Sequence, residues 1–309
     1  MQKIRIFLNP RASSGESVEL VEGLKRKLFR SELEFVSPDG LDRLHEELLR
    51  AVSDRVDAIV AVGGDGTANT LIQDLAGSNV ALLLVPAGTA NDLAREIGLD
   101  RRIERAVEAV RRSNERCIDL IRINGRYMAT NGGLGLGASV ALQVNEWRAQ
   151  APLFKRFMKL TGPNIYSAGV VLKLLGPGGR GIPFRIDVDG VVSEIRTPIL
   201  MINNQPVLGG NFAIAPSTRN DDGTFNVAGF GHRHRLGFLK GLLDIRRGRD
   251  PRNDPEFFTA EARRVRIDVL DGQTLPFFGD GEFLCEASSF DIEIMPKGLR
   301  LFSPLGEAL

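Results

Sequence analysis

The sequence predicts two domains: an α/β N-terminal domain with an open parallel sheet, and a β-rich C-terminal sandwich domain. In residues 1–123, short apolar runs alternate with amphipathic segments, which is the order of strands and helices in a parallel sheet. In residues 124–298, alternating segments are separated by glycine and Asp-Gly turns, which is typical of an antiparallel sheet or sandwich. The length of 309 residues suits two domains, and residues 299–309 are candidates for a return to the first one.

The composition indicates a soluble globular protein of the cytoplasm. Hydrophobic residues make up 43% and charged residues 26% of the chain, which are both ordinary values. The net charge of +1 argues against a nucleic-acid partner, because it provides no overall basic field. Two cysteines, Cys117 and Cys285, do not amount to a disulfide framework. Residues 1–10 are too quickly interrupted by proline for a signal peptide, and no apolar run approaches the roughly 18 residues of a membrane span.

The first domain shows its elements in a regular order. Short apolar runs predict strands at residues 3–9, 33–37, 56–62, 81–85 and 118–123. Apolar residues at helical spacing predict helices between them, at residues 18–28, 41–52, 92–97 and 103–112, with a further one from Thr67. In such a sheet, ligands bind outside the carboxyl ends of the strands. We therefore expect the loops at 9–15, 63–67 and 86–92 to meet at one edge.

The segment 56–69 carries the strongest functional signal. A buried strand is followed by Gly63, Gly64 and Gly66, which allow a tight turn and bring backbone N–H groups close to an anion. Thr67 is predicted to cap the helix that follows. A strand, a glycine turn and a helix N-terminus together form a phosphate site. The alternative is a tight strand-to-helix turn without a ligand.

The aspartate within this turn indicates the kind of chemistry. A carboxylate beside a phosphate is repelled unless a cation lies between them or the carboxylate accepts a proton. Asp65 therefore favours magnesium-dependent nucleotide chemistry over simple cofactor docking.

A second glycine turn follows the neighbouring strand, at residues 86–92. Gly88 and Thr89 are candidates to contact phosphate or ribose, and Asp92 adds a second carboxylate at the same sheet edge. The alternative is a well-capped helix start in which Asp92 only favours the helix dipole.

The second domain offers fewer chemical signals. Its strands are expected at 183–188, 199–203, 225–230, 265–269 and 290–294, with helical segments at 147–175 and 236–246. The glycine run 132–137 is interpreted as a glycine-rich strand edge. Basic residues mixed with apolar ones at 147–173 and 232–252 are typical either of a solvated helix face or of an element that attracts anionic lipid headgroups.

The motifs together resemble a known family. GGDGT at 63–67, PAGTANDLAR at 86–95, Asn9-Pro10 and Ser14-Gly15 are similar to motifs of bacterial lipid kinases related to diacylglycerol kinase and, more distantly, to NAD kinases. Later motifs agree in order and spacing along nearly the whole chain: CIDL at 117–120, Ala215-Pro216 before DDG at 221–223, and Asp280-Gly281-Glu282. The resemblance implies a phosphofructokinase- or NAD kinase-like first domain and the ATP- and Mg²⁺-dependent phosphorylation of a lipid hydroxyl.

The resemblance also implies roles for individual residues. ATP would be bound by Asn9, Ser37, Gly63, Gly64, Asp65, Gly66, Thr67, Ala68, Asn69, Gly88 and Thr89. Asp222, with the carbonyls of Arg219 and Thr224, would hold a structural magnesium ion. An acidic network of Asp65, Asp92 and Asp119 would position catalytic magnesium and the γ-phosphate. Asp280 would be the base that accepts the proton of the acceptor hydroxyl, and Glu282 lies in the same turn. Without the resemblance, the residues of Asp222-Gly223 and Asp280-Gly281 predict only ordinary type I′ hairpin turns.

Four positions depart from the pattern of the family. Glu16 stands where members usually carry a basic residue, and Arg11 is a candidate to supply that charge. Thr70 stands where many members have glutamate. Ser37 replaces a nucleotide-contacting threonine, and Asn226 replaces an aspartate common after the magnesium turn.

The expected partner is a diacylglycerol-like lipid at the inner face of the membrane, and a homodimer is the assembly that the resemblance suggests. Two other functions stay open. One is an NAD kinase-like activity on a soluble nucleotide, against which the segment 92–95 argues. The other is a nucleotide-sensing regulatory protein without turnover, for which the departures at Glu16 and Thr70 leave room.

Overall fold

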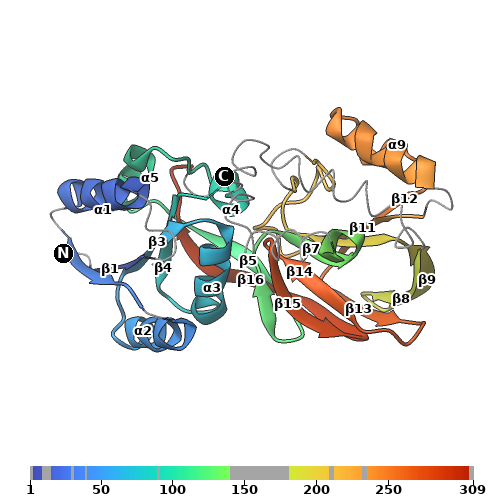
Figure 1. Ribbon diagram of the computed structural model, residues 1–309, viewed down its shortest axis with the longest axis horizontal. Coiled ribbons are helices and arrows are strands. Elements are labelled where there is room, and N and C mark those ends of the chain that lie inside the picture. Colours follow the sequence, from blue (N-terminus) through green and yellow to red (C-terminus); the bar gives the residue numbers. More distant parts are fainter. Residues whose placement is uncertain are drawn as a thin grey trace. The chain divides into compact units, whose positions relative to one another are not determined.

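The structure is a computed structural model that describes residues 3–8, 15–28, 31–38, 40–88, 91–139, 181–208, 212–231 and 235–305 (Figure 1). The chain forms two compact units: Met1–Leu120 with Lys297–Leu309, and Ile121–Pro296. The first unit is α/β with a mostly parallel sheet and the second is an antiparallel β-sandwich, so the predicted fold class is confirmed.

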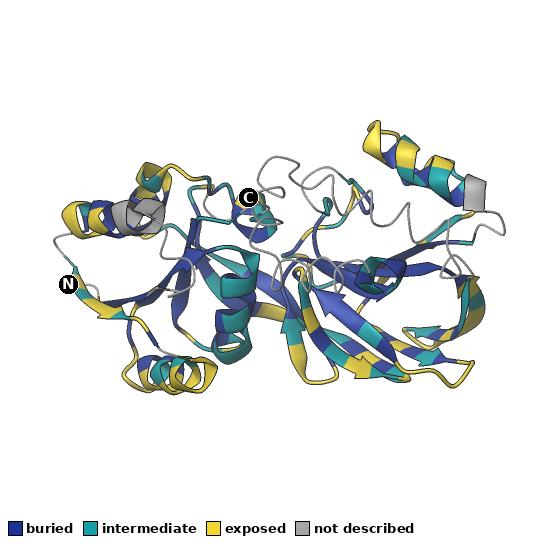
Figure 2. Ribbon diagram, in the orientation of Figure 1, coloured by how far each residue is buried: buried dark blue, intermediate teal, exposed yellow. Residues whose placement is uncertain are grey.

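A parallel sheet forms the centre of the first unit. Its strands follow the order β2-β1-β3-β4, and all three pairings are parallel. The strands are β1 (Lys3–Leu8), β2 (Glu32–Val36), β3 (Ala58–Gly63) and β4 (Ala81–Pro86). Every residue of β3 and β4 is buried, which explains their continuous apolar sequences (Figure 2). Beside β4, Leu301 pairs in parallel with Leu82, so the end of β16 (Ser289–Phe302) extends this sheet.

Helices pack in pairs around the sheet: α1 contacts α5, and α2 contacts α3. Their bounds are α1 (Gly15–Lys27), α2 (Leu41–Ser53), α3 (Asp65–Leu75), α4 (Asp92–Glu96) and α5 (Ile103–Arg111). The prediction that Thr67 caps α3 is wrong, because the helix begins at Asp65 with Gly64 at the N-cap. The glycine turn is therefore shorter than expected, and Asp65 lies in the first turn of the helix. None of the helices in the described ranges is long and apolar enough to cross a bilayer.

Two groups of strands form the second unit. One sheet has the order β12-β11-β10-β7-β14-β15 and is antiparallel throughout. Its strands are β7 (Asn131–Gly135), β10 (Ile199–Asn203), β11 (Phe225–Phe230), β12 (Phe257–Ala262), β14 (Leu275–Gly279) and β15 (Glu282–Ala287). The other group contains β5 (Glu115–Ile123), β6 (Arg126–Met128), β8 (Ile182–Val188), β9 (Val191–Thr197), β13 (Arg264–Val269) and the start of β16. Phe184, Phe277 and Phe290 are fully buried in the core of this unit.

The sequence suggested that the glycine run at 132–137 is a strand edge, and this prediction is wrong. It supplies β7, which lies inside the sheet between β10 and β14. A Cβ on Gly132 would collide with the carbonyl oxygen of Phe278, and one on Gly133 with that of Leu200. Glycine is required here because both neighbouring backbones approach closely.

The helix predicted at 236–246 is confirmed as α9 (Arg235–Arg246), which is followed by a short 3₁₀ turn, Pro251–Asn253. The helical segment predicted at 147–175 lies outside the described residues.

Candidate active site

The two glycine turns of the first unit touch each other at the carboxyl ends of β3 and β4. The N–H of Ala87 donates to the carbonyl oxygen of Gly63 at 2.8 Å. A Cβ added to Gly88 would lie 2.6 Å from the Cα of Gly64, which is closer than real Cβ contacts allow. The backbones therefore pack directly against each other, and only glycine fits at this contact. The third loop of the predicted site, at 9–14, lies outside the described residues.

Asp65 joins these two turns through its carboxylate. One oxygen accepts the N–H of Asn91 at 2.8 Å, and the other accepts the N–H of Asp92 at 2.7 Å. These two N–H groups begin α4, so a side chain from α3 caps a different helix. The two hydrogen bonds fix the orientation of a half-buried carboxylate at the sheet edge where ligands bind in open α/β sheets.

Asn91 holds the second turn and was not singled out in the sequence. Its backbone is left-handed, with φ 52° and ψ 50°, a conformation that asparagine tolerates better than most residues. Its Oδ1 accepts the N–H of Gly88 at 3.0 Å, and its Nδ2 donates to the carbonyl of the same residue at 2.9 Å. The carbonyl of Gly88 also accepts a hydrogen bond from Arg101 at 2.8 Å. The only sign of this arrangement in the sequence is an asparagine two residues after the pair Gly88-Thr89.

The other predicted nucleotide residues lie in different environments. The side chain of Thr67 occupies the space where a Cβ of Gly63 would be. Ala68 and Asn69 are buried on α3, and Ser37 is exposed after β2. The hydroxyl of Thr70 donates to the carbonyl oxygen of Gly66 at 2.9 Å, within its own helix. Two further predicted residues, Asn9 and Thr89, fall outside the described residues.

Asp92 and Asp119 have different surroundings. The carboxylate of Asp92 lies 3.9 Å from the guanidinium of Arg95, one turn later in the same helix. Asp119 is 1% exposed within β5, and its Oδ1 accepts the N–H of Lys297 at 2.7 Å. In the part of the chain that the structure describes, no three His, Cys, Asp or Glu side chains gather closely enough to hold a metal ion.

The predicted metal turn in the second unit is ordered by its own carboxylate. Oδ1 of Asp222 accepts the N–H of Thr224 at 3.0 Å and its hydroxyl at 2.9 Å. Arg219 donates to Asp221 at 3.0 Å, and this hydrogen bond raises the pKa of the arginine. Asp222 is exposed, and a carboxylate and backbone carbonyls are the oxygen ligands that Mg²⁺ prefers. The residue types of this turn therefore fit a magnesium ion.

Asp280 lies in a tight turn between β14 and β15. Both Asp280 and Gly281 have positive φ, 55° and 77°, as the predicted type I′ hairpin requires. Glu282, the first residue of β15, pairs with Gly279.

The carboxylate of Asp280 is not exposed like that of an ordinary turn residue. The residue is 8% exposed, and its carboxylate accepts hydrogen bonds from two residues that lie 150 and 151 positions earlier in the chain. Thr130 donates both its N–H, at 2.7 Å, and its hydroxyl, at 2.6 Å. The N–H of Ala129 donates at 3.0 Å. The sequence did not reveal Thr130, because nothing in its local pattern distinguishes it.

Two protein families account for most of this chain. Residues 3–123 match the diacylglycerol kinase catalytic domain, and residues 154–303 match the YegS C-terminal NAD kinase beta sandwich-like domain. The chain belongs to the diacylglycerol kinase-like lipid kinase family. The resemblance drawn from the motifs is thereby confirmed.

Individual relatives agree with this family. A diacylglycerol kinase of Mycobacterium tuberculosis is 27% identical over 313 residues, which cover 98% of this chain and 95% of that protein. A diacylglycerol kinase of Bacillus subtilis is 27% identical over 230 residues, which cover 74% of this chain and 71% of the relative. The crystal structure of a diacylglycerol kinase from Bacillus anthracis covers 98% of this chain and 96% of its own, with a TM-score of 0.70 and 19% identity. That structural likeness shows the shared fold.

Gly88→Ala tests the contact between the glycine turns. We expect it to destabilise the first unit and to weaken nucleotide binding, because its Cβ would meet the Cα of Gly64 at 2.6 Å and Asn91 Oδ1 at 2.7 Å. Gly40→Ala is the matched control, because no described atom lies within 4 Å of its added Cβ and its φ of −174° suits any residue. Urea unfolding and ATP titration measure the two effects; equal behaviour of both variants would contradict the contact.

Asp65→Asn tests the capping of α4. Asparagine has one acceptor oxygen in place of two, so one N–H of Asn91 or Asp92 loses its partner. We expect the free energy of unfolding to fall by about 1 kcal/mol without any nucleotide present. Asp42→Asn is the control, because Asp42 lies in the first turn of α2 and is exposed. Unchanged unfolding of Asp65→Asn would show that the cap does not form.

Proposed function

We propose that this protein transfers the γ-phosphate of ATP to the hydroxyl of a diacylglycerol-like lipid in a magnesium-dependent reaction. The observation that carries the proposal is the pair of glycine turns clamped by Asp65 at the carboxyl ends of β3 and β4. In a chain of the lipid kinase family, a glycine-lined sheet edge with a fixed carboxylate suits a nucleotide and its cation.

We assign ATP to the first unit. The N-cap of α3 is Gly64, which has no side chain of its own to cap the helix, and a helix N-terminus favours a phosphate group through its N–H groups and its dipole. Gly63, Gly66, Thr67, Asn69 and Gly88 complete the proposed contacts. Ser37 and Ala68 belong to the same proposed set, as do Asn9 and Thr89, which lie outside the described residues.

Magnesium is assigned to two places. Asp222, with the carbonyls of Arg219 and Thr224, would hold a structural ion, since these are oxygen ligands in a turn that hydrogen bonds already order. Asp65, Asp92 and Asp119 would form an acidic network that positions the catalytic ion and the γ-phosphate, where the ion would neutralise charge on the transferred phosphoryl group.

Asp280 is assigned the role of general base. As the lipid oxygen bonds to the γ-phosphorus, the bond from that phosphorus to the bridging oxygen of ADP breaks, and the hydroxyl proton passes to Asp280. The donors at Ala129 and Thr130 support this role, because they hold the carboxylate in one orientation. Glu282, in the same turn, is assigned to the acceptor side of the site.

The second unit is assigned to the lipid, which it would meet at the cytoplasmic face of the membrane. Of the two basic segments, 147–173 lies outside the described residues. In the other, Arg249 lies 3.0 Å from Asp244, and Arg252 pairs with Asp250. Arg247 also lies 3.8 Å from Asp244. Ion pairs within the segment therefore reduce the attraction that its cations would exert on anionic lipid.

Transfer of labelled phosphate from ATP into a total lipid extract, with mass identification of the product, tests the proposed function. A magnesium-dependent phospholipid product supports it. Transfer to NAD in place of lipid would replace it with a soluble nucleotide kinase. Bound ATP without any labelled product would replace it with a nucleotide sensor.

Asp280→Asn tests the assigned base. We expect lipid phosphorylation to fall by about 100-fold or more, while the affinity for ATP is unchanged, because only proton transfer is affected. Asp271→Asn is the matched control, since Asp271 also precedes a glycine in a turn but is exposed. Single-turnover transfer and ATP titration measure the two properties. Loss of ATP binding together with activity would contradict the assignment.

Thr130→Val tests the orientation of that base. Removing the hydroxyl donor 2.6 Å from Asp280 should lower kcat by about tenfold and leave the KM for ATP unchanged, because the residue acts through the carboxylate. Thr130→Ser should restore kcat. A valine variant with wild-type kcat would show that the hydroxyl has only a structural role.

A further inference from the structure

Asn204 binds the two residues that hold the carboxylate of Asp280. It is the first residue after β10 and is fully buried. Its side-chain Nδ2 donates to the carbonyl oxygen of Ala129 at 2.9 Å, and its backbone N–H donates to the carbonyl oxygen of Thr130 at 2.8 Å. The N–H groups of Ala129 and Thr130 both donate to Asp280. Asn204 therefore contacts the part of the backbone that orients the proposed base.

A single peptide group connects Asn204 with Asp280. The carbonyl of Ala129 and the N–H of Thr130 belong to the same planar peptide group. The carbonyl accepts the amide of Asn204, and the N–H donates to Oδ1 of Asp280 at 2.7 Å. Successive hydrogen bonds in a buried place strengthen one another, because each bond polarises the next. The amide of Asn204 should therefore strengthen the hydrogen bond from Thr130 to Asp280 and fix the peptide plane that makes it.

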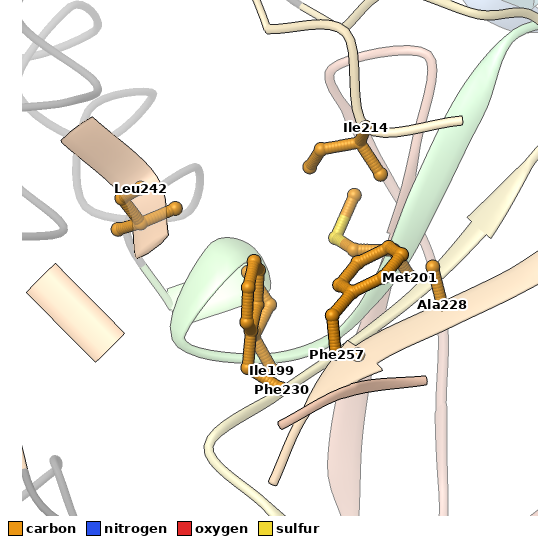
Figure 3. A pocket seen from close by; sticks show the side chains of 8 residues that line it. Ile199, Met201, Ile214, Ala228, Phe230, Leu242 and Phe257 are labelled. Carbon is orange, nitrogen blue, oxygen red and sulfur yellow. The ribbon is translucent and has the colours of Figure 1, made fainter. Parts of the chain in front are cut away.

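The strand before Asn204 is a rigid support. β10 is an interior strand, paired with β7 on one side and with β11 on the other. Leu200 and Ile202 are fully buried in the core of the second unit. Ile199 and Met201 point to the opposite face, where they line a small apolar pocket (Figure 3). Packing on both faces thus fixes the strand end from which Asn204 reaches the backbone at 129–130, and side chains held by strands are positioned more precisely than those on loops.

The preceding residue, Asn203, provides a contrast. It is equally buried and lies directly opposite Asn131 of β7 and Asn226 of β11. Within the described ranges, neither its Nδ2 nor its Oδ1 has a hydrogen-bond partner. Two consecutive buried asparagines therefore differ in one respect: the side chain of Asn204 binds the backbone that holds Asp280, and that of Asn203 does not.

We propose that Asn204 is a positioning residue for phosphate transfer. Its amide fixes the peptide group between Ala129 and Thr130, and through it keeps the carboxylate of Asp280 in the orientation that accepts the proton of the lipid hydroxyl. This inference rests on the proposed function, in which Asp280 is the base. Orientation matters because a general base must lie within hydrogen-bond distance of the proton that it removes.

Asn204→Leu in the full-length protein tests this inference. Leucine has approximately the size of asparagine and removes the amide donor, so we expect kcat for phosphate transfer to lipid to fall by about tenfold while the KM for ATP is unchanged. Asn203→Leu is the matched control and should keep the wild-type kcat, because it makes the same change at an equally buried neighbour whose amide has no described partner. Rates are measured per folded protein, with urea unfolding as the measure of stability. Asn204→Ala serves as the second variant if Asn204→Leu does not fold.

The amide proton of Thr130 provides a readout that does not depend on activity. In protein labelled with ¹⁵N-threonine, its NMR resonance is identified by its disappearance in Thr130→Val. Weakening of a hydrogen bond moves the resonance of its amide proton upfield. We therefore expect an upfield shift in Asn204→Leu, because the hydrogen bond from Thr130 to Asp280 weakens, and no shift in Asn203→Leu.

The outcomes separate this inference from the proposed function. A wild-type kcat in the folded Asn204 variant, an equal loss in Asn203→Leu, or an unchanged Thr130 resonance would overturn the inference and leave the proposed function in place. A rise in the KM for ATP together with the loss of kcat would also overturn it, because Asn204 would then have a general structural role. An upfield shift in Asn204→Leu, without phosphate transfer to any lipid by the wild-type protein, would keep the link from Asn204 to Asp280 and defeat the proposed function.

Discussion

The hydrogen bonds from Asp65 to the start of α4 are the constraint on which the first unit depends. They connect a residue of α3 to two backbone groups about 26 positions later, and they hold the two glycine turns in contact. Two backbones that approach this closely leave no room for a Cβ, so the sequence must place glycine at both points. The same carboxylate that secures the loops also brings negative charge to the sheet edge. The side chain of Asp65 thus contributes both to the stability of the first unit and to the proposed cation chemistry.

Asp280, the proposed base, shows how a hairpin turn can hold a carboxylate in a fixed orientation. A type I′ turn normally exposes its first central residue, and an aspartate there has water as its partner. Here the carboxylate turns inward and is held by Thr130 and by the backbone of Ala129. In the proposed reaction, such an oriented, largely buried carboxylate would lose little entropy when the acceptor hydroxyl arrives. The positive φ at Asp280 is the local conformational cost of this arrangement.

The second unit has a row of buried asparagines, Asn131, Asn203 and Asn226, in its six-stranded sheet. Asn203 is fully buried with an unsatisfied amide, in a strand that otherwise consists of aliphatic residues and methionine. A leucine at this position would remove the cost of desolvating the amide.

Local patterns in the sequence were sufficient for the alternation of strands and helices, the two glycine turns and the positive-φ turn at Asp280-Gly281. These features depend on near neighbours and on the backbone preferences of glycine and asparagine or aspartate. Other features depend on the order and register of strands, which no short segment specifies. Register alone brings Asn131, Asn203 and Asn226 into one row, and it places Gly132 and Gly133 inside a sheet. Likewise, only the folded chain could bring Thr130 to Asp280. It also shows that Asp65, a predicted phosphate neighbour, caps another helix.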